Sequence, residues 1–115
     1  VDLALDTFPY TGATISIENL WMGVPVLTLT GDRLVFRQGV GILINAGLTN
    51  WIASNKEEYV SKAVNFTSDL NKLNLLRNSL RARVLTSPLF NAQRFAKNLE
   101  NALWGMWQHW KKTRA

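Results

Sequence analysis

The chain of 115 residues has no cysteine, a single histidine and no long apolar run. The missing cysteines exclude a disulfide framework, and one histidine is too few to build a structural zinc site. No apolar stretch approaches the ~20 residues that a membrane-spanning helix needs, so we expect no membrane partner. These absences favour a cytoplasmic protein, and we expect neither a metal ion nor a cofactor.

Acidic residues are scarce in the second half of the chain. Residues 1–55 carry two basic and four acidic side chains, and residues 56–115 carry eleven basic and four acidic ones. The two parts therefore have net charges of −2 and +7, which together make the +5 of the whole chain. A basic half can bind nucleic acid, so a basic helical nucleic-acid-binding module is one alternative. The lysines and arginines are spread over three helical patterns, however, which favours a solvated outer face.

The first half of the chain alternates short apolar runs with helical patterns. With 47% hydrophobic residues the chain can bury a core. The pattern predicts strands at residues 1–6, 24–29 and 51–53 and helices at residues 14–22 and 35–45, with Gly23 as the cap of the first helix. Such alternation predicts an α/β fold with a parallel sheet and crossover helices.

The second half is helical throughout. We predict helices at residues 56–67, 70–85 and 91–111, preceded by the helix-starting residues Asn55, Asp69 and Asn91. Residues 1–55 and 56–115 are expected to form the sheet part and the helical extension of one domain. Because the sequence opens inside an apparent strand without a start methionine, we also expect it to be a piece of a longer protein.

The segment with the most chemical content is residues 11–18, TGATISIE in one-letter code, which opens the first predicted helix. Open α/β sheets bind ligands at the carboxyl ends of their strands. Free N–H groups and the helix dipole favour an anion there, such as a diphosphate. Gly12 would let the backbone approach closely, and the hydroxyls of Thr14 and Ser16 could add donors. Glu18 lies four residues after Thr14, on the same helix face, where a carboxylate suits the hydroxyls of a ribose.

These residues also have ordinary structural explanations. Threonine and serine are common helix caps, and the helix dipole alone favours a carboxylate in the first turn. The segment lacks the glycine pattern of a dinucleotide fingerprint or of a P-loop. The residue types alone therefore leave the nucleotide site and the simple helix start as alternatives.

A few other positions are weaker candidates. Asp6 and Ser16 are possible cleft residues, although an aspartate at a strand end as often fixes the following turn. Arg37 can reach a phosphate or lie on the surface, and His109 is expected at the surface without a catalytic role. Three tryptophans at helical spacing could form a base-stacking platform, but core or interdomain packing is favoured for Trp104, Trp107 and Trp110.

Taken as a string, the sequence resembles the catalytic region of the peptide O-linked N-acetylglucosaminyltransferases and their bacterial relatives. The resemblance is carried by LDT at residues 5–7, by the glycine–threonine turn with a carboxylate four residues after Thr14, and by LWMGVPV at residues 20–26. It continues in SPLF at residues 87–90 and in the aromatic final helix. These motifs occur in order and span nearly the whole chain.

The resemblance implies a GT-B glycosyltransferase, in which two Rossmann-like domains hold UDP-N-acetylglucosamine between them, usually behind tetratricopeptide repeats. This chain would be the incomplete second domain, with a protein as acceptor and no metal ion. Thr14 corresponds to a threonine that contacts the diphosphate, and Glu18 to the acidic residue that holds the ribose. The diphosphate-binding residues would be Gly12, Ala13, Thr14 and Ile15.

The sequence departs from the family at two positions. Ile15 stands where a second threonine is usual, and Ala13 stands where histidine or glycine is common, so two polar contacts to phosphate are missing. A non-catalytic scaffolding domain is therefore a further alternative. The family's lysine and histidine groups near the sugar have no counterpart here, so we expect no catalytic residue and no activity in this chain alone. Its exposed apolar surfaces should also make it self-associate.

Overall fold

The computed structural model describes residues 1–114, and its first 53 residues form a small parallel sheet with two crossover helices. The order of elements is the predicted one: β1 (Ala4–Leu5), α1 (Thr14–Trp21), β2 (Val26–Leu29), the 3-10 turn η1 (Leu34–Phe36), α2 (Gln38–Asn45), the 3-10 turn η2 (Thr49–Trp51) and β3 (Ile52–Ala53). The strands lie in the order β1-β2-β3. Both neighbouring pairs are parallel, with Ala4 opposite Val26 and Thr28 opposite Ile52. The predicted α/β fold is confirmed.

The rest of the chain is helical, as predicted. It consists of α3 (Lys56–Ser68), α4 (Leu70–Leu85), the 3-10 turn η3 (Pro88–Phe90) and α5 (Ala92–Arg114). The side chains of Asn55, Asp69 and Asn91 accept hydrogen bonds from the backbone N–H three residues later, at 2.8, 3.0 and 2.9 Å. These caps fix the starts of α3, α4 and α5.

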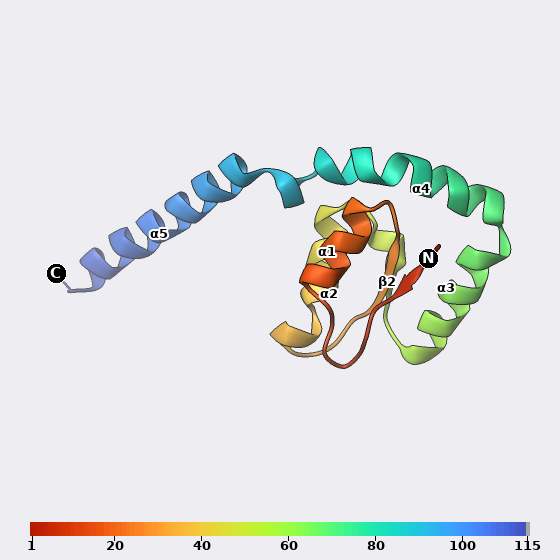
Figure 1. Ribbon diagram of the computed structural model, residues 1–115. Helices are drawn as coiled ribbons and strands as arrows, with labels where there is room; N and C mark the ends of the chain where they lie inside the picture. The colour runs from red at the N-terminus through yellow and green to blue at the C-terminus, as the bar shows by residue number, and fades with distance from the viewer. Residues whose placement is uncertain (115) are drawn as a thin grey trace.

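The core surrounds β2, whose four residues are all buried. Figure 1 shows α1 and α2 on one side of β2, α3 on the other, and α4 running across the end of all of them. Apolar side chains without any exposed surface come from both crossover helices, the sheet and α4, and include Leu20, Leu27, Leu43, Leu80 and Val84. Burying leucine and valine in this way is the main stabilising contribution, about 1.5–3 kcal/mol for each side chain.

Two glycines end the crossover helices. Gly23 and Gly47 have φ of +75° and +73°, a conformation that costs glycine little. After Gly23, the N–H of Val24 donates to the carbonyl of Asn19 at 2.8 Å, and the N–H of Leu48 makes the same bond to Leu43 at 2.9 Å. These are Schellman caps. Because Val24 completes the cap, the second strand begins at Val26 and is shorter than the predicted 24–29.

Several further boundaries differ from the prediction; α5, for example, ends at Arg114 instead of residue 111. The first strand covers only Ala4–Leu5 instead of residues 1–6. The helix predicted at 35–45 is divided into η1 and α2, because Arg37 has φ −122° and ψ 9° and interrupts the helical backbone. Its guanidinium donates to the carbonyl of Gly31 at 3.1 Å, so Arg37 holds the preceding turn.

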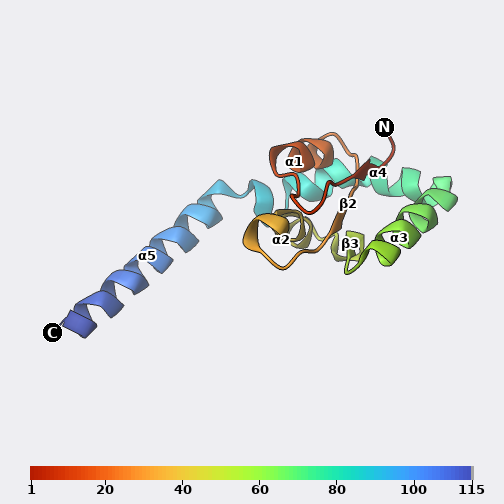
Figure 2. The same cartoon turned by 90° about the horizontal axis from the view of Figure 1, so that it is seen from below.

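The final helix projects away from the rest of the molecule. In Figures 1 and 2, α5 extends from η3 into solvent, and no residue of Ala92–Arg114 is buried. The radius of gyration is 17.2 Å, compared with about 13 Å for a compact chain of this size. Of the two packings expected for the tryptophans of this helix, packing into the core of this chain is wrong, since Trp104, Trp107 and Trp110 are 64%, 49% and 44% exposed. Interdomain packing stays a prediction.

Candidate functional site

The loop of residues 7–13 carries the chain from the carboxyl end of β1 to the start of α1. The hydroxyl of Thr7 donates to the carbonyl of Tyr10 at 2.8 Å, and the Phe8–Pro9 peptide is cis. The ring of Phe8 lies edge-on against Tyr59 with centroids 5.5 Å apart, which ties the loop to α3. The loop therefore delivers residues 12–16 to the edge of the sheet at which α/β proteins bind ligands.

The N-terminus of α1 has unused backbone donors. The first backbone hydrogen bond of the helix runs from the N–H of Ile17 to the carbonyl of Ala13 at 3.1 Å. The N–H groups of residues 13–16 therefore have no acceptor within the helix. Ala13 occupies the capping position and makes no side-chain capping bond. α2 also lacks a side-chain cap, whereas α3, α4 and α5 each have one.

Thr14 and Glu18 lie on the exposed face of α1, and Ile15 is 70% exposed. Thr14 begins the helix and Glu18 follows one turn later, with no acidic residue in the first turn. The helix dipole acts mainly on the first turn, so it does not by itself explain the carboxylate at residue 18. Both side chains are free to meet a ligand on this face.

Asp6 and Ser16 lie in the protein interior instead of an open cleft, with 8% and 4% of their surfaces exposed. One carboxylate oxygen of Asp6 accepts the N–H of Gly12 at 2.7 Å, and the other accepts the hydroxyl of Thr28 at 2.7 Å. Asp6 thus fixes the turn after β1, which was the alternative to a place in the cleft. The N–H of Gly12 is occupied by this bond. Of the four residues expected to bind the diphosphate, Gly12 therefore has no free N–H to donate.

The sequence did not reveal three other residues around Asp6. Thr11 and Thr28 have no exposed surface, and the N–H of Gly39 donates to the hydroxyl oxygen of Thr11 at 3.2 Å. The signals were present but unspecific: a threonine inside the apolar run VLTL, and two glycines in the helical pattern QGVGILIN. Their partners lie 22 and 28 residues away, so spacing could not identify them.

The remaining candidates have no contact that indicates a ligand site. Arg37 is exposed and bonded to its own turn, and His109 is exposed on α5. Among residues 1–114, no three histidine, aspartate or glutamate side chains come close enough together to hold a metal ion. None of the helices in the same part of the chain has the length and apolar character required to span a membrane.

Several arginines of α4 contact the body of the protein. Arg77 pairs with Asp2, and Arg83 donates to the carbonyl of Gly47 at 3.4 Å. The guanidinium of Arg81 lies 5.6 Å from the centre of the Trp21 ring. These contacts give the positive charges of α4 a structural role and speak against a nucleic-acid surface on this helix.

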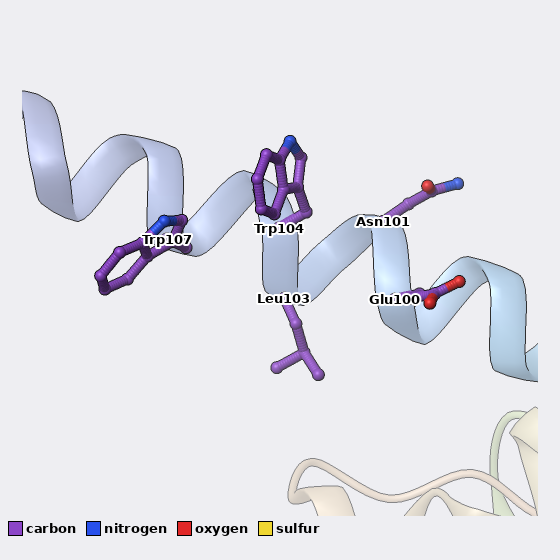
Figure 3. A pocket seen from close by; sticks show the side chains of 5 residues that line it. All are labelled: Glu100, Asn101, Leu103, Trp104 and Trp107. Atoms are coloured by element: carbon purple, nitrogen blue, oxygen red, sulfur yellow. The ribbon is translucent and has the colours of Figure 1, made fainter.

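One surface hollow with two tryptophans in its lining lies on α5. It is bordered by Glu100, Asn101, Leu103, Trp104 and Trp107, all from the same helix. Figure 3 shows Leu103 and Trp104 pointing to opposite sides of the helix, so these side chains cannot enclose a ligand. We regard it as an open helix surface, distinct from the site at α1.

Comparison with known proteins identifies the family. The model of glycosyl transferase family 41 matches residues 1–99. Two plant relatives are probable UDP-N-acetylglucosamine--peptide N-acetylglucosaminyltransferases called SPINDLY. The one from Solanum lycopersicum is 41% identical over 110 residues and the one from Arabidopsis thaliana 42% over 112, covering 96% and 97% of this chain. The chain spans only 12% of the length of each relative.

A solved structure shows the same arrangement in three dimensions. A mutant O-GlcNAc transferase from Thermobaculum terrenum superimposes with a TM-score of 0.91 at 39% sequence identity, covering 100% of this chain and 22% of that one. The GT-B fold expected from the sequence is confirmed by this similarity. The match of the family model over most of the chain, the whole-chain relatives and the superposition agree, and the chain belongs to glycosyl transferase family 41.

Proposed function

We propose that this chain forms the part of a longer glycosyltransferase that binds the nucleotide of UDP-N-acetylglucosamine. The observation that carries the proposal is the uncapped start of α1, where the N–H groups of residues 13–16 lack acceptors in the helix. A diphosphate placed there would receive these donors and the positive end of the helix dipole. Thr14 would add its hydroxyl, while Ala13 and Ile15 contribute backbone N–H groups only.

Glu18 is proposed to bind the ribose. Its carboxylate lies one turn beyond Thr14 on the exposed face of α1, so a nucleotide with its phosphates at the helix start can place the ribose next to it. A carboxylate accepts two hydroxyl hydrogen bonds at once, which suits the 2′ and 3′ hydroxyls.

The chemical role of this site would be to stabilise the leaving group. When the hydroxyl of a protein side chain attacks the anomeric carbon, the bond to UDP breaks and negative charge grows on the diphosphate. Fixed N–H groups directed at that charge lower the barrier without reorganisation. No metal ion is needed in this scheme, because the helix donors take the charge. Acceptor binding and proton removal are assigned to other parts of the longer protein.

The test is a calorimetric titration of the full-length protein that contains this chain with UDP, UDP-N-acetylglucosamine and GDP. We expect both uridine nucleotides to bind and GDP to bind more weakly. Thr14→Val should weaken UDP binding, whereas Thr67→Val, an equal change on the exposed face of α3, should not. Equal affinity of the Thr14→Val variant and the unaltered protein for UDP would contradict the phosphate contact.

A cytoplasmic location of the longer protein stays a prediction from the sequence. If the chain is instead a non-catalytic scaffolding domain, the same titration should detect no nucleotide binding. The titration therefore separates the two functions directly.

A further inference from the structure

A buried polar network lies directly beneath the loop that leads to α1. It has two neighbouring parts: Asp6, just after β1, accepts from Gly12 and from Thr28 on β2, and Thr11 in the loop accepts from Gly39 in the first turn of α2. Within residues 1–114, every buried side-chain nitrogen or oxygen has a hydrogen-bond partner, so this network is fully satisfied. Such networks hold a backbone in one arrangement.

Asp6 fixes the residue that stands immediately before the free donors of α1. Its two oxygens accept from Gly12 and Thr28 at 2.7 Å each. A Cβ atom on residue 12 would lie 2.9 Å from the hydroxyl of Ser16 and 3.2 Å from Asp6, so the loop is packed closely against the network. The direction in which the N–H groups of residues 13–16 point therefore depends on the position of Asp6.

Thr11 connects the same loop to α2. Its hydroxyl oxygen accepts the N–H of Gly39 at 3.2 Å, and the hydroxyl donates to the carbonyl of Val35 at 3.4 Å. A Cβ atom on residue 39 would lie 2.3 Å from the hydroxyl of Thr28 and 2.6 Å from Asp6. The first turn of α2 thus packs on the Asp6–Thr28 pair and is bonded to Thr11, while Asp6 holds Gly12, so the starts of both crossover helices depend on these neighbouring hydrogen bonds.

These side chains cannot touch a ligand themselves. Thr11 and Thr28 have no exposed surface, and Asp6 has 8%. Any influence on a ligand must pass through the backbone that they hold. We propose that Asp6, Thr11 and Thr28 are positioning residues that aim the N–H groups of residues 13–16 at the donor diphosphate. This inference rests on the proposed nucleotide site.

The network offers variants that separate hydrogen bonding from charge. Thr28→Val removes the hydroxyl at nearly constant volume, and Thr28→Ser restores it. Asp6→Asn removes the charge, yet its carbonyl can still accept from Gly12 and its amide can donate to Thr28. If position is what matters, Thr28→Ser and Asp6→Asn should bind UDP like the unaltered protein, while Thr28→Val should not.

The experiment compares the dissociation constants of UDP and of uridine in the full-length protein, measured by calorimetry. Displacement of the loop of residues 7–13 should weaken UDP binding by about tenfold or more, while uridine, which has no phosphate, binds unchanged. We therefore expect Thr28→Val to lower the ratio of UDP to uridine affinity, and Thr67→Val to leave it unchanged. Thr11→Val gives a second measurement of the same effect if Thr28→Val does not fold.

The outcomes distinguish this inference from the function on which it rests. If the unaltered protein does not bind UDP, both fail. If Glu18→Ala weakens UDP binding but the affinity ratio in folded Thr28→Val and Thr11→Val stays that of the unaltered protein, the positioning role alone is overturned. Equal loss of UDP and uridine binding would also overturn it, because that result indicates general damage to the fold.

Discussion

The hydroxyl of Tyr59 on α3 donates to the backbone carbonyl of Asp6 at 2.8 Å, across 53 residues of sequence. The N–H of the same Asp6 is bonded to the carbonyl of Leu27 at 2.9 Å. Tyr59 therefore satisfies the carbonyl that follows the last residue of β1, and it ties the helical part of the chain to the strand that leads into the loop of residues 7–13.

We predict that this bond makes stability fall at high pH. Burial, and then the nearby negative charge of Asp6, raise the pKa of Tyr59 above its ordinary value of 10. Since the folded state keeps the proton longer than the unfolded state, the stabilising contribution is complete below pH 10 and is lost as the pH rises through the raised pKa. Thermal melts from pH 8 to 11 should show this loss.

Tyr59→Phe is the matched variant for this measurement. It should lower the free energy of unfolding by about 1–3 kcal/mol at neutral pH, because the buried carbonyl of Asp6 loses its donor. It should also flatten the pH dependence above pH 10. If Tyr59→Phe is as stable as the unaltered chain and loses the same stability above pH 10, then the hydrogen bond to Asp6 does not stabilise the fold. The loss of stability at high pH would then not come from Tyr59.

Two glycines of α2 provide a test of the packing at the network. Gly39→Ala should destabilise the protein by about 1–3 kcal/mol, the usual cost of overpacking, because its Cβ would lie 2.3 Å from Thr28. Gly41→Ala, two residues away, meets nothing within 4 Å and should stabilise the helix by up to about 1 kcal/mol. Urea denaturation of the two variants measures the difference in their free energies of unfolding. Equal changes would show that Gly39 does not pack closely against Thr28 and Asp6.

Loss of the carboxylate at residue 18 should weaken nucleotide binding. Glu18→Ala is expected to cost about 1.5–3 kcal/mol of UDP affinity, the range for hydrogen bonds to a charged group, or about 10- to 150-fold in the dissociation constant. Glu57→Ala, an equal change on the exposed surface of α3, is the control. If calorimetry gives both variants the affinity of the unaltered full-length protein, Glu18 does not bind the ribose.

The 115-residue chain alone should have no transferase activity. It spans 12% of the length of its plant relatives, and its site residues bind only one part of the donor in the proposed scheme. Incubation with labelled UDP-N-acetylglucosamine and a mixture of peptides is expected to give no labelled product. Turnover at ordinary enzyme rates would show that the chain contains a catalytic group that we have not recognised.

We also predict that the isolated chain self-associates through α5. Leu99, Leu103, Met106 and Trp110 follow one another at spacings of four, three and four residues and are all exposed, so they form one apolar stripe. Light scattering over a concentration series should give a mass above 13.0 kDa for the unaltered chain. The net charge of +5 should not prevent this at physiological salt, where charges are screened beyond about 8 Å.

The control uses the opposite face of the same helix. Leu103→Lys should make the chain monomeric, whereas Asn101→Lys, which adds the same charge, should not; Figure 3 shows the two side chains on different sides of α5. A monomeric mass for the unaltered chain at every concentration would refute the prediction.

The sequence predicted those elements whose ends depend on local interactions. α4 begins and ends at Leu70 and Leu85 as expected, because Asp69 caps it from the adjacent position. The break at Arg37 was missed, since it depends on a turn whose geometry the pattern does not encode. The order and direction of the strands followed from their alternation with helices.

For the candidate site, the sequence predicted the exposed residues but not the buried residues that hold the loop in front of α1. Thr14 and Glu18 lie on one face of α1, which four-residue spacing predicts. Asp6 was considered for the cleft and proved to be internal, because its partners Gly12 and Thr28 come together only when β1 and β2 pair. Hydrophobicity favoured core or interdomain packing for the tryptophans of α5, and within this chain they are exposed because α5 projects away from the rest of the molecule.

The stacked indoles at the end of α5 give this protein a natural optical reporter. The rings of Trp107 and Trp110 lie 5.0 Å apart with 20° between their planes, whereas Trp21 and Trp51 pack against phenylalanines within the body. Two chromophores at this separation couple their electronic transitions, so the near-ultraviolet circular dichroism should contain a signal from α5 alone. Any surface that covers the helix will shift that signal and the red-shifted emission of the exposed rings, without an added label.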